Sequence, residues 1–202
     1  MSNTTKTKKK MKTFELKGTL RTDLGKKASK AMRRAGSVPC ELYGNGENIH
    51  FSCTQDALRK LIYTPEIYLV NLNIEGREEK AIIKELQFHP VSDKVIHIDF
   101  LAVTEDKPIV MDVPVRLEGL AVGVRAGGKL SLEMRKLRVK GLYNNVPEVL
   151  TINVENLDLG KTIQVKALQF DNLELLNAPN SVVCAVKLTR AARGAAAAAA
   201  AK

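Results

Sequence analysis

The segment from His89 to Phe100 (HPVSDKVIHIDF) holds the side chains of this 202-residue chain that are best suited to chemistry. Successive side chains of a strand point to opposite faces, which gives this segment two different faces. One face is apolar and would belong to a core: Ile96, Ile98 and Phe100. The other face comprises Val95, His97 and Asp99. The imidazole and the carboxylate would lie roughly 7 Å apart along the strand, so both can touch the same partner.

Four interpretations of His97 and Asp99 are open. A metal site would need a third ligand, and although His89 or His50 is a candidate, no local spacing fixes either residue. A catalytic pair would need an activated nucleophile, and no Ser or Cys accompanies the pair in a known motif. The structural alternative is a hydrogen-bonded pair at a strand end. In an RNA contact, the carboxylate would accept from a base amino group, while the imidazole would stack or donate to a phosphate.

The positive charge of the chain is concentrated at its N-terminal end. Residues 1–34 hold twelve Lys or Arg and two acids, which accounts for the whole net charge of +10. A concentrated basic segment attached to a neutral body is typical of a protein that binds a polyanion. A solvated tail is the alternative, and it suits the run from Lys6 to Lys12 well.

Residues 26–35 (KKASKAMRRA) are predicted to form a helix, which Gly36 would end. At the helical period, the small residues gather on one side and would pack closely: Ala28, Ala31, Met32 and Ala35. The cations gather on the opposite side: Lys26, Lys30, Arg33 and Arg34, with Lys27 at the edge. A merely solvated helix usually interleaves acids as i,i+4 partners, and this one has none. The basic face therefore indicates polyanion contact, with a solvated face as the alternative.

The elements that position these residues are mostly strands. We expect strands around Phe14–Leu20 and over Cys40–Tyr43, Asn48–Cys53, Ile67–Ile74, Glu79–His89 and Lys94–Val103, and a second helix over Gln55–Tyr63 with Thr54 as its N-cap. The Gly44-Asn45-Gly46 turn makes a hairpin of two of these strands. Tyr43 stands beside that turn, where its ring could stack on a distorted base pair or form part of the core.

The fold class predicted from this order is mainly β: an N-terminal antiparallel β-barrel with two to three helices, followed by a separate all-β C-terminal domain. The expected divisions are a disordered basic arm (1–12), an RNA-binding barrel domain (13–104), a C-terminal β domain (108–189) and an Ala-rich tail (190–202). A polar, proline-ended break at 104–108 separates the two domains. The glycine-punctuated segment 120–128 lacks the context of a phosphate cradle and is interpreted as a connection.

The composition excludes several classes of protein. The three cysteines are far apart and form no C-x-x-C pair, so neither a disulfide framework nor a zinc knuckle is expected. No apolar run approaches the roughly 20 residues that a membrane span needs. The N-terminus lacks the apolar core of a secretory signal. We therefore expect a cytoplasmic protein.

Two stretches of the chain resemble a known family. RTDLGKKASKAMRRAGSVPCELYG (residues 21–44) and QFHPVSDKVIHIDF (residues 87–100) are similar to the bacterial large-subunit ribosomal protein twenty-five family. The similarity is closest to its long form, the general stress protein CTC type, and covers about residues 12–188. It implies a non-enzymatic structural constituent of the large subunit, located on the ribosome, that binds 5S ribosomal RNA at internal loop E in the central protuberance. It implies no cofactor, metal or small-molecule substrate, and as further partners neighbouring ribosomal proteins and large-subunit RNA.

Carried over position by position, the resemblance implies an RNA-contacting set of ten residues: Arg21, Lys26, Ser29, Lys30, Arg33, Tyr43, Gln87, His89, His97 and Asp99. The chain departs from the family pattern at Lys27, where many relatives have Gly, and at Lys30-Ala31, where an Arg pair is common. A lysine meets a phosphate as a point charge, without the bidentate fork of arginine. Two other functions stay open: a metal-dependent hydrolase using His89, His97 and Asp99, and a protein-interaction module acting through the C-terminal domain.

Overall fold

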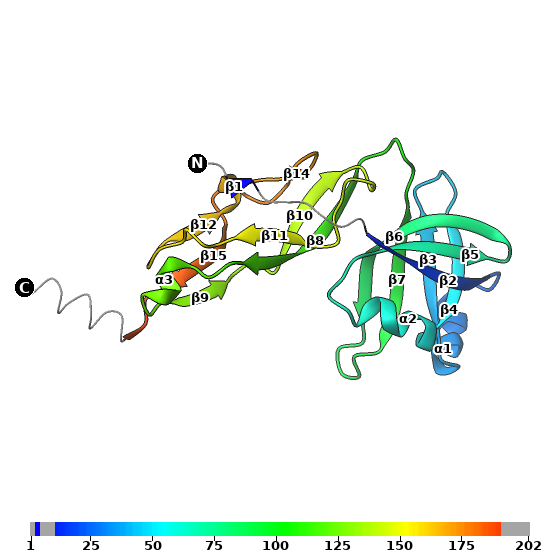
Figure 1. The fold of residues 1–202 in the computed structure, drawn as a ribbon. Helices are drawn as coiled ribbons and strands as arrows, with labels where there is room; N and C mark the ends of the chain where they lie inside the picture. Colours follow the sequence, from blue (N-terminus) through cyan, green and yellow to red (C-terminus); the bar gives the residue numbers. More distant parts are fainter. Residues whose placement is uncertain (1–2, 5–10, 191–202) are drawn as a thin grey trace, which may run out of the picture. The chain divides into compact units, whose positions relative to one another are not determined.

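The computed structural model describes residues 3–4 and 11–190 of the chain (Figure 1). They divide into two compact units: residues 11–109 with 142–144 form one, and residues 110–141 and 145–190 with 3–4 form the other. The prediction of a mainly β protein with an N-terminal barrel and a separate C-terminal β domain is confirmed. Most of the predicted basic arm and nearly all of the predicted Ala-rich tail lie outside the described residues.

The first unit is a closed six-stranded barrel in the order β2-β4-β3-β7-β6-β5. Its strands are β2 (Lys12–Leu20), β3 (Ser37–Tyr43), β4 (Ile49–Thr54), β5 (Tyr68–Ile74), β6 (Arg77–Phe88) and β7 (Val95–Ala102). Most neighbours are antiparallel, as predicted, but β2 with β5 and β3 with β7 pair in parallel. In this order β3, β7 and β6 are neighbours, and they lie side by side in the wall of the barrel (Figure 1).

Two helices accompany the barrel, α1 (Lys26–Arg34) between β2 and β3 and α2 (Gln55–Ile62) between β4 and β5. Gly36 follows α1 with φ of 80°, a conformation that glycine adopts without strain, so its predicted role in ending the helix is confirmed. Thr54 does stand at the N-cap position of α2, but its side chain makes no capping hydrogen bond.

The barrel core is aliphatic around one aromatic pair. Phe51 and Phe100 are fully buried, with ring centroids 5.6 Å apart. The backbone of β2 passes close to this pair, since a Cβ atom added at Gly18 would lie 2.6 Å from Cδ2 of Phe51. Glycine at this position therefore lets β2 close the barrel.

The predicted alternation of β7 is wrong at its start. Val95, expected on the polar face, is 5% exposed and belongs to the core, whereas Ile96, expected in the core, is only half-buried. The cause is a register shift between β6 and β7: Gln87 pairs with His97, but the next residue, Phe88, pairs with Val95. Ile96 is the extra residue of this irregularity, and an extra residue reverses the inside–outside phase of the strand.

The C-terminal unit contains two sheets, one in the order β11-β8-β10-β14 and one in the order β12-β15-β9, and β1 (Asn3–Thr4) pairs with β13. Its elements are β8 (Ile109–Glu118), α3 (Val122–Arg125), β9 (Lys129–Leu132), β10 (Lys136–Gly141), β11 (Leu150–Asn153), β12 (Thr162–Gln164), η1 (Val165–Ala167), β13 (Leu168–Gln169), β14 (Glu174–Leu175) and β15 (Val182–Lys187). The segment 120–128, predicted as a plain connection, thus contains the short helix α3. Gly123 fits there because a Cβ atom would lie 2.5 Å from the main-chain nitrogen of Leu159.

Candidate nucleic-acid interface

Helix α1 lies on the surface of the barrel without a single buried residue. Ala28, Ser29 and Met32 are half-buried against the barrel, but Ala31 and Ala35 are exposed. The prediction that the small-residue side packs closely is therefore wrong for its outer part. A helix gains most of its stability from packing an apolar face, and α1 is packed only partly. Both the cations and part of the small-residue side of α1 are open to a ligand.

Two arginines hold α1 in place. Arg21, just after β2, donates from Nη2 to the hydroxyl of Ser29 over 3.2 Å, and its main-chain nitrogen donates to the carbonyl of His50 over 2.9 Å. At the other end of the helix, Arg33 donates from Nε to the carbonyl of Ile96 over 3.0 Å. The bond from Arg33 places the end of the basic helix at the start of β7, directly before His97.

A row of polar side chains crosses the outer surface of β3, β7 and β6. Glu41 on β3 pairs in register with Asp99 on β7, and Glu85 on β6 pairs with the same aspartate. Gln87, exposed on β6, stands opposite His97. The predicted residues Gln87, His97 and Asp99 are therefore brought together on one surface.

His97 and Asp99 interact directly. Nδ1 of the imidazole lies 2.7 Å from Oδ1 of the carboxylate, and the two side chains are 25% and 27% exposed. This contact is the hydrogen-bonded pair that was one of the four interpretations of the sequence. It is also compatible with ligand binding, because an imidazole has a second polar nitrogen, Nε2, on the opposite edge of its ring.

Tyr43 ends β3 on the same surface, two residues after Glu41. Partial burial, followed by the nearby carboxylates of Asp99, Glu85 and Glu41, raises the pKa of its phenol. The ring is half-buried, so it can pack against the barrel and still leave one edge open to a ligand. From Ile96 to Leu101, the residue paired with Tyr43, β7 extends roughly 17 Å at the usual rise per residue. The basic helix therefore meets one end of this surface and the tyrosine stands at the other.

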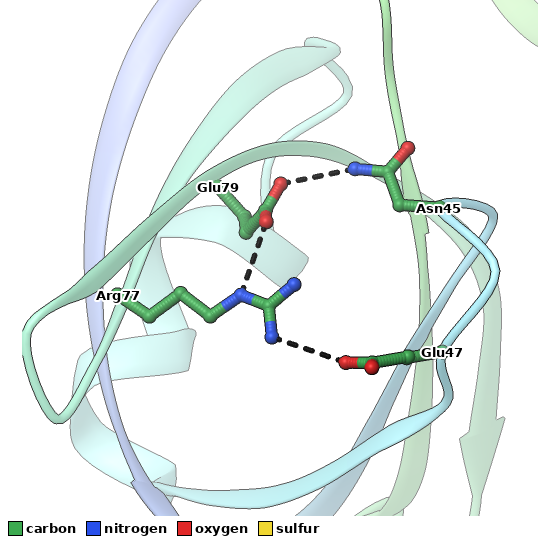
Figure 2. A network of polar contacts seen from close by, with 4 residues as sticks. All are labelled: Asn45, Glu47, Arg77 and Glu79. Atoms are coloured by element: carbon green, nitrogen blue, oxygen red, sulfur yellow. Dashed lines mark hydrogen bonds and ion pairs between the residues drawn. The ribbon is translucent and has the colours of Figure 1, made fainter.

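The turn after Tyr43 is fixed by a polar network (Figure 2). Arg77 at the start of β6 donates from Nε to Glu79 over 3.2 Å and from Nη1 to Glu47 over 3.4 Å. Asn45 donates to the same Glu79 carboxylate over 3.1 Å. The two hydrogen bonds from Arg77 to carboxylates also raise the pKa of its guanidinium. Because Asn45 and Glu47 belong to the β3–β4 turn, the network holds that turn against the β5–β6 hairpin.

His89 has a structural role that its sequence context did not reveal. Its Nδ1 accepts hydrogen bonds from the main-chain nitrogens of Val91 and Ser92, each over 3.3 Å. The main-chain atoms of His89 also close the turn, bonding to Lys94 and Asp93. His89 therefore shapes the β6–β7 turn through Nδ1, and only its remaining ring edge is available for a ligand.

The alternatives that need catalytic chemistry find little support in the geometry. Cys40 and Cys53 lie on β3 and β4 in the barrel core, and a hydrogen bond with Cys53 together with burial raises the pKa of the Cys40 thiol. A buried thiol of raised pKa is a poor nucleophile. Within residues 3–4 and 11–190, no three His, Cys, Asp or Glu side chains are grouped so that they could hold a metal ion. None of the helices in the described part of the chain is long and apolar enough to cross a membrane.

The charges of the barrel unit are separated along the sequence. Residues 11–34 carry eight Lys or Arg and two acids, whereas residues 35–107 carry seven Lys or Arg and twelve acids. The basic part includes α1, and the acidic part includes the row Glu41, Asp99 and Glu85. Sequence reasoning missed Glu41 and Glu85. The alternation of β3 around the buried Cys40 and Leu42 would have placed Glu41 on the outer face, but Glu85 follows a register shift between β6 and β7 that alternation alone does not reveal. A surface with cations at one end and hydrogen-bond acceptors along the strands can meet phosphates and base amino groups together.

Comparison with known proteins finds relatives along both units. Residues 16–100 match the ribosomal L25p family, and residues 108–190 match the C-terminal domain of ribosomal protein TL5. Large ribosomal subunit protein bL25 of Porphyromonas gingivalis is 63% identical over 188 residues, which cover 92% of this chain and 98% of that protein. The protein of the same name from Bacteroides thetaiotaomicron is 58% identical over 194 residues, covering 94% and 99% of the two chains. The resemblance to the long form of this family, inferred from two motifs, is confirmed.

Proposed function

The chain belongs to the ribosomal L25p family, and from this premise we propose that it is a structural constituent of the large ribosomal subunit that binds 5S ribosomal RNA. Its relatives from Porphyromonas gingivalis and Bacteroides thetaiotaomicron are named as proteins of that subunit. The binding surface is the outer face of the barrel formed by α1, β3, β7 and β6. The segment of RNA bound is internal loop E, in the central protuberance.

One observation carries this proposal: the hydrogen bond from Arg33 to Ile96 joins a basic helix with no buried residue to the strand that bears His97 and Asp99. In the proposed complex, Lys26, Lys30 and Arg33 neutralise phosphates. Such contacts supply affinity and position the RNA but carry no sequence information.

Selectivity would come from the strand surface. The carboxylate of Asp99 accepts from a base amino group, and Nε2 of His97 meets the same RNA. Tyr43 stacks on, or packs against, a distorted base pair. RNA-binding proteins gain sequence selectivity where base pairs are irregular, because the bases of a regular A-form helix are poorly accessible. An internal loop supplies such irregular pairs.

A gel-shift titration with two RNAs tests the proposal. One RNA is 5S ribosomal RNA with its loop E intact, and the other carries Watson–Crick pairs in place of that loop. We expect the full chain to bind the intact RNA at least tenfold more tightly, because the regular helix offers phosphates without the bases that the strand surface contacts. Equal affinity for the two RNAs would contradict the assignment to loop E, and no binding to either RNA would contradict the function itself.

A further inference from the structure

In the C-terminal unit, two segments far apart in sequence lie side by side and carry four exposed cations. The hydroxyl of Thr189 donates to the carbonyl of Gly127 over 2.6 Å, which joins the segment after β15 to the segment before β9. In the adjoining strands, Lys187 is directly paired with Lys129. We call these four exposed cations the C-terminal basic edge: Arg125, Lys129, Lys187 and Arg190.

The arrangement is unfavourable for the fold alone. Like charges directly opposite each other on neighbouring strands destabilise a sheet. One carboxylate compensates in part, since Nζ of Lys187 lies 2.7 Å from Oε1 of Glu133, and a hydrogen bond from this lysine lowers the pKa of the Glu133 carboxyl. Within residues 3–4 and 11–190, Arg125, Lys129 and Arg190 have no ion pair with a carboxylate. The basic edge therefore retains an excess of positive charge.

Another sheet of the same unit shows the contrasting arrangement. There Lys140 is directly paired with Glu174, with 3.1 Å between Nζ and Oε2. Arg138 lies 3.0 Å from Asp112, and their contact raises the pKa of the guanidinium. Both of these cations face a carboxylate, whereas Arg116 and Lys136 of the same sheet have no ion pair within the described residues. On the basic edge, Lys187 has such a partner in Glu133, whereas Arg125, Lys129 and Arg190 have none within the described residues.

The sequence beyond the edge does not supply the missing negative charge. Residues 191–202 (AARGAAAAAAAK) contain two cations and no acid. A partner of opposite charge from another molecule would compensate the edge. A polyanion with regularly spaced charges fits a row of cations on adjoining segments, since each phosphate neutralised by Lys or Arg releases condensed counterions.

We propose that the C-terminal basic edge is a second RNA-binding surface, which takes the phosphate backbone of large-subunit ribosomal RNA. The choice of RNA over another polyanion rests on the proposed function of the barrel. The four residues that define the edge are all cations, which bind the phosphate backbone and contribute no base selectivity. The protein thus contacts two RNA segments, the loop E region through the barrel and a second one through this edge.

The test uses the full chain with a saturating amount of 5S ribosomal RNA, so that the barrel is occupied, and deproteinised large-subunit ribosomal RNA as the probe. The edge variant is R125Q/K129Q/R190Q, which leaves the Lys187–Glu133 pair intact. The matched control is R116Q/K136Q/K166Q, which removes three exposed cations of the same unit that lie elsewhere. We expect the edge variant to lose at least tenfold in affinity and the control less than twofold. The salt dependence of binding should weaken in the edge variant by about two units of slope.

Two further measurements fix the interpretation. The charge-retaining variant R125K/R190K should bind within twofold of the wild type, and urea midpoints equal to the wild type exclude a folding defect. Equal losses of affinity in the edge variant and the control, or no loss in either, would overturn the proposal. A titration with purified ribosomal proteins in place of the RNA would overturn it too, if the edge variant lost affinity only for those proteins. Failure of the proposed function is seen separately, as absence of 5S RNA binding by the wild type.

Discussion

Arg33 donates from Nε to the main-chain oxygen of Ile96 over 3.0 Å, and this bond joins the last turn of α1 to the first residues of β7. Ile96 is the extra residue in the pairing of β6 with β7, so its carbonyl stands where the regular ladder is interrupted. The arginine thus satisfies an acceptor of an irregular strand while it carries one of the charges of the basic helix. In the proposed complex, a phosphate contact and the position of His97 both depend on this residue.

Replacing Arg33 by alanine should weaken binding to 5S ribosomal RNA about tenfold, or about 1.4 kcal/mol. The variant loses both a phosphate contact and the bond that sets α1 against β7. Arg33→Lys keeps the charge but cannot reproduce the hydrogen bond from Nε. Its affinity for the RNA should therefore fall between that of the wild type and that of Arg33→Ala. Filter-binding titrations at one fixed salt concentration measure all three proteins. Wild-type affinity in Arg33→Ala would contradict this role.

Asp99→Ala should cost roughly 1–3 kcal/mol of binding free energy, because the carboxylate is assigned to a base amino group. Glu85→Ala is the matched control, since Glu85 is paired with Asp99 across β6 and β7 and has the same charge. Removing a carboxylate near a polyanion without a base contact should leave binding unchanged or slightly tighter. Isothermal titration with the loop E fragment compares the two. Equal changes in binding free energy for the two variants would contradict the assignment of Asp99 to a base amino group.

The Tyr43 phenol should remain neutral to a more alkaline pH than a free tyrosine. Burial raises its pKa, and the carboxylates of Asp99, Glu85 and Glu41 raise it further, because a phenolate would be desolvated and repelled. Because the pKa of this phenol is higher in the folded chain than in the unfolded chain, the phenol contributes to the free energy of unfolding. That contribution is fully present below the ordinary pKa and is lost as the pH rises through the folded-state pKa. Ultraviolet titration of the wild type against Tyr43→Phe isolates this phenol. A midpoint at or below the ordinary value near 10 would contradict the acidic surroundings.

Much of this site follows from sequence because its elements are locally consistent. The basic face of α1 and the end of the helix at Gly36 depend on spacing within a few residues, which sequence preserves. The phase of β7 did not follow, because the extra residue Ile96 is defined only by the pairing with β6. The turn-shaping role of His89 depends on hydrogen bonds to Val91 and Ser92 that no residue pattern specifies.

The C-terminal unit was harder to predict for a related reason. The strands Leu168–Gln169 and Glu174–Leu175 have two residues each, too short for an alternating pattern to appear. The helix Val122–Arg125 is one turn long and depends on the close approach of Gly123 to Leu159. The paired lysines at positions 129 and 187 become neighbours only through the register of β9 and β15. Sequence alone predicted an all-β domain and placed none of the predicted site residues in it.

Gly18→Ala should destabilise the barrel by about 1–3 kcal/mol, as overpacking of a filled core typically does. The added methyl group would lie 2.6 Å from the ring of Phe51, which is fully buried and packed against Phe100. Urea unfolding followed by circular dichroism measures the loss. Lys17→Ala, a change at an exposed neighbour in the same strand, is the control and should stay within about 0.5 kcal/mol of the wild type. A fully stable Gly18→Ala variant would show that β2 does not close against Phe51 as described.

In the proposed complex, α1 supplies phosphate contacts and β7 supplies a base contact to one and the same RNA. The salt dependence of the affinity for 5S ribosomal RNA tests this arrangement, measured for the wild type, K26Q/K30Q and Asp99→Ala. If about five phosphates are neutralised, log K should fall against log salt with a slope near −4 for the wild type. The double variant should have a slope about two units shallower, whereas Asp99→Ala should give a weaker line parallel to the wild type. A flat wild-type line, or an unchanged slope in K26Q/K30Q, would show that α1 does not supply the phosphate contacts.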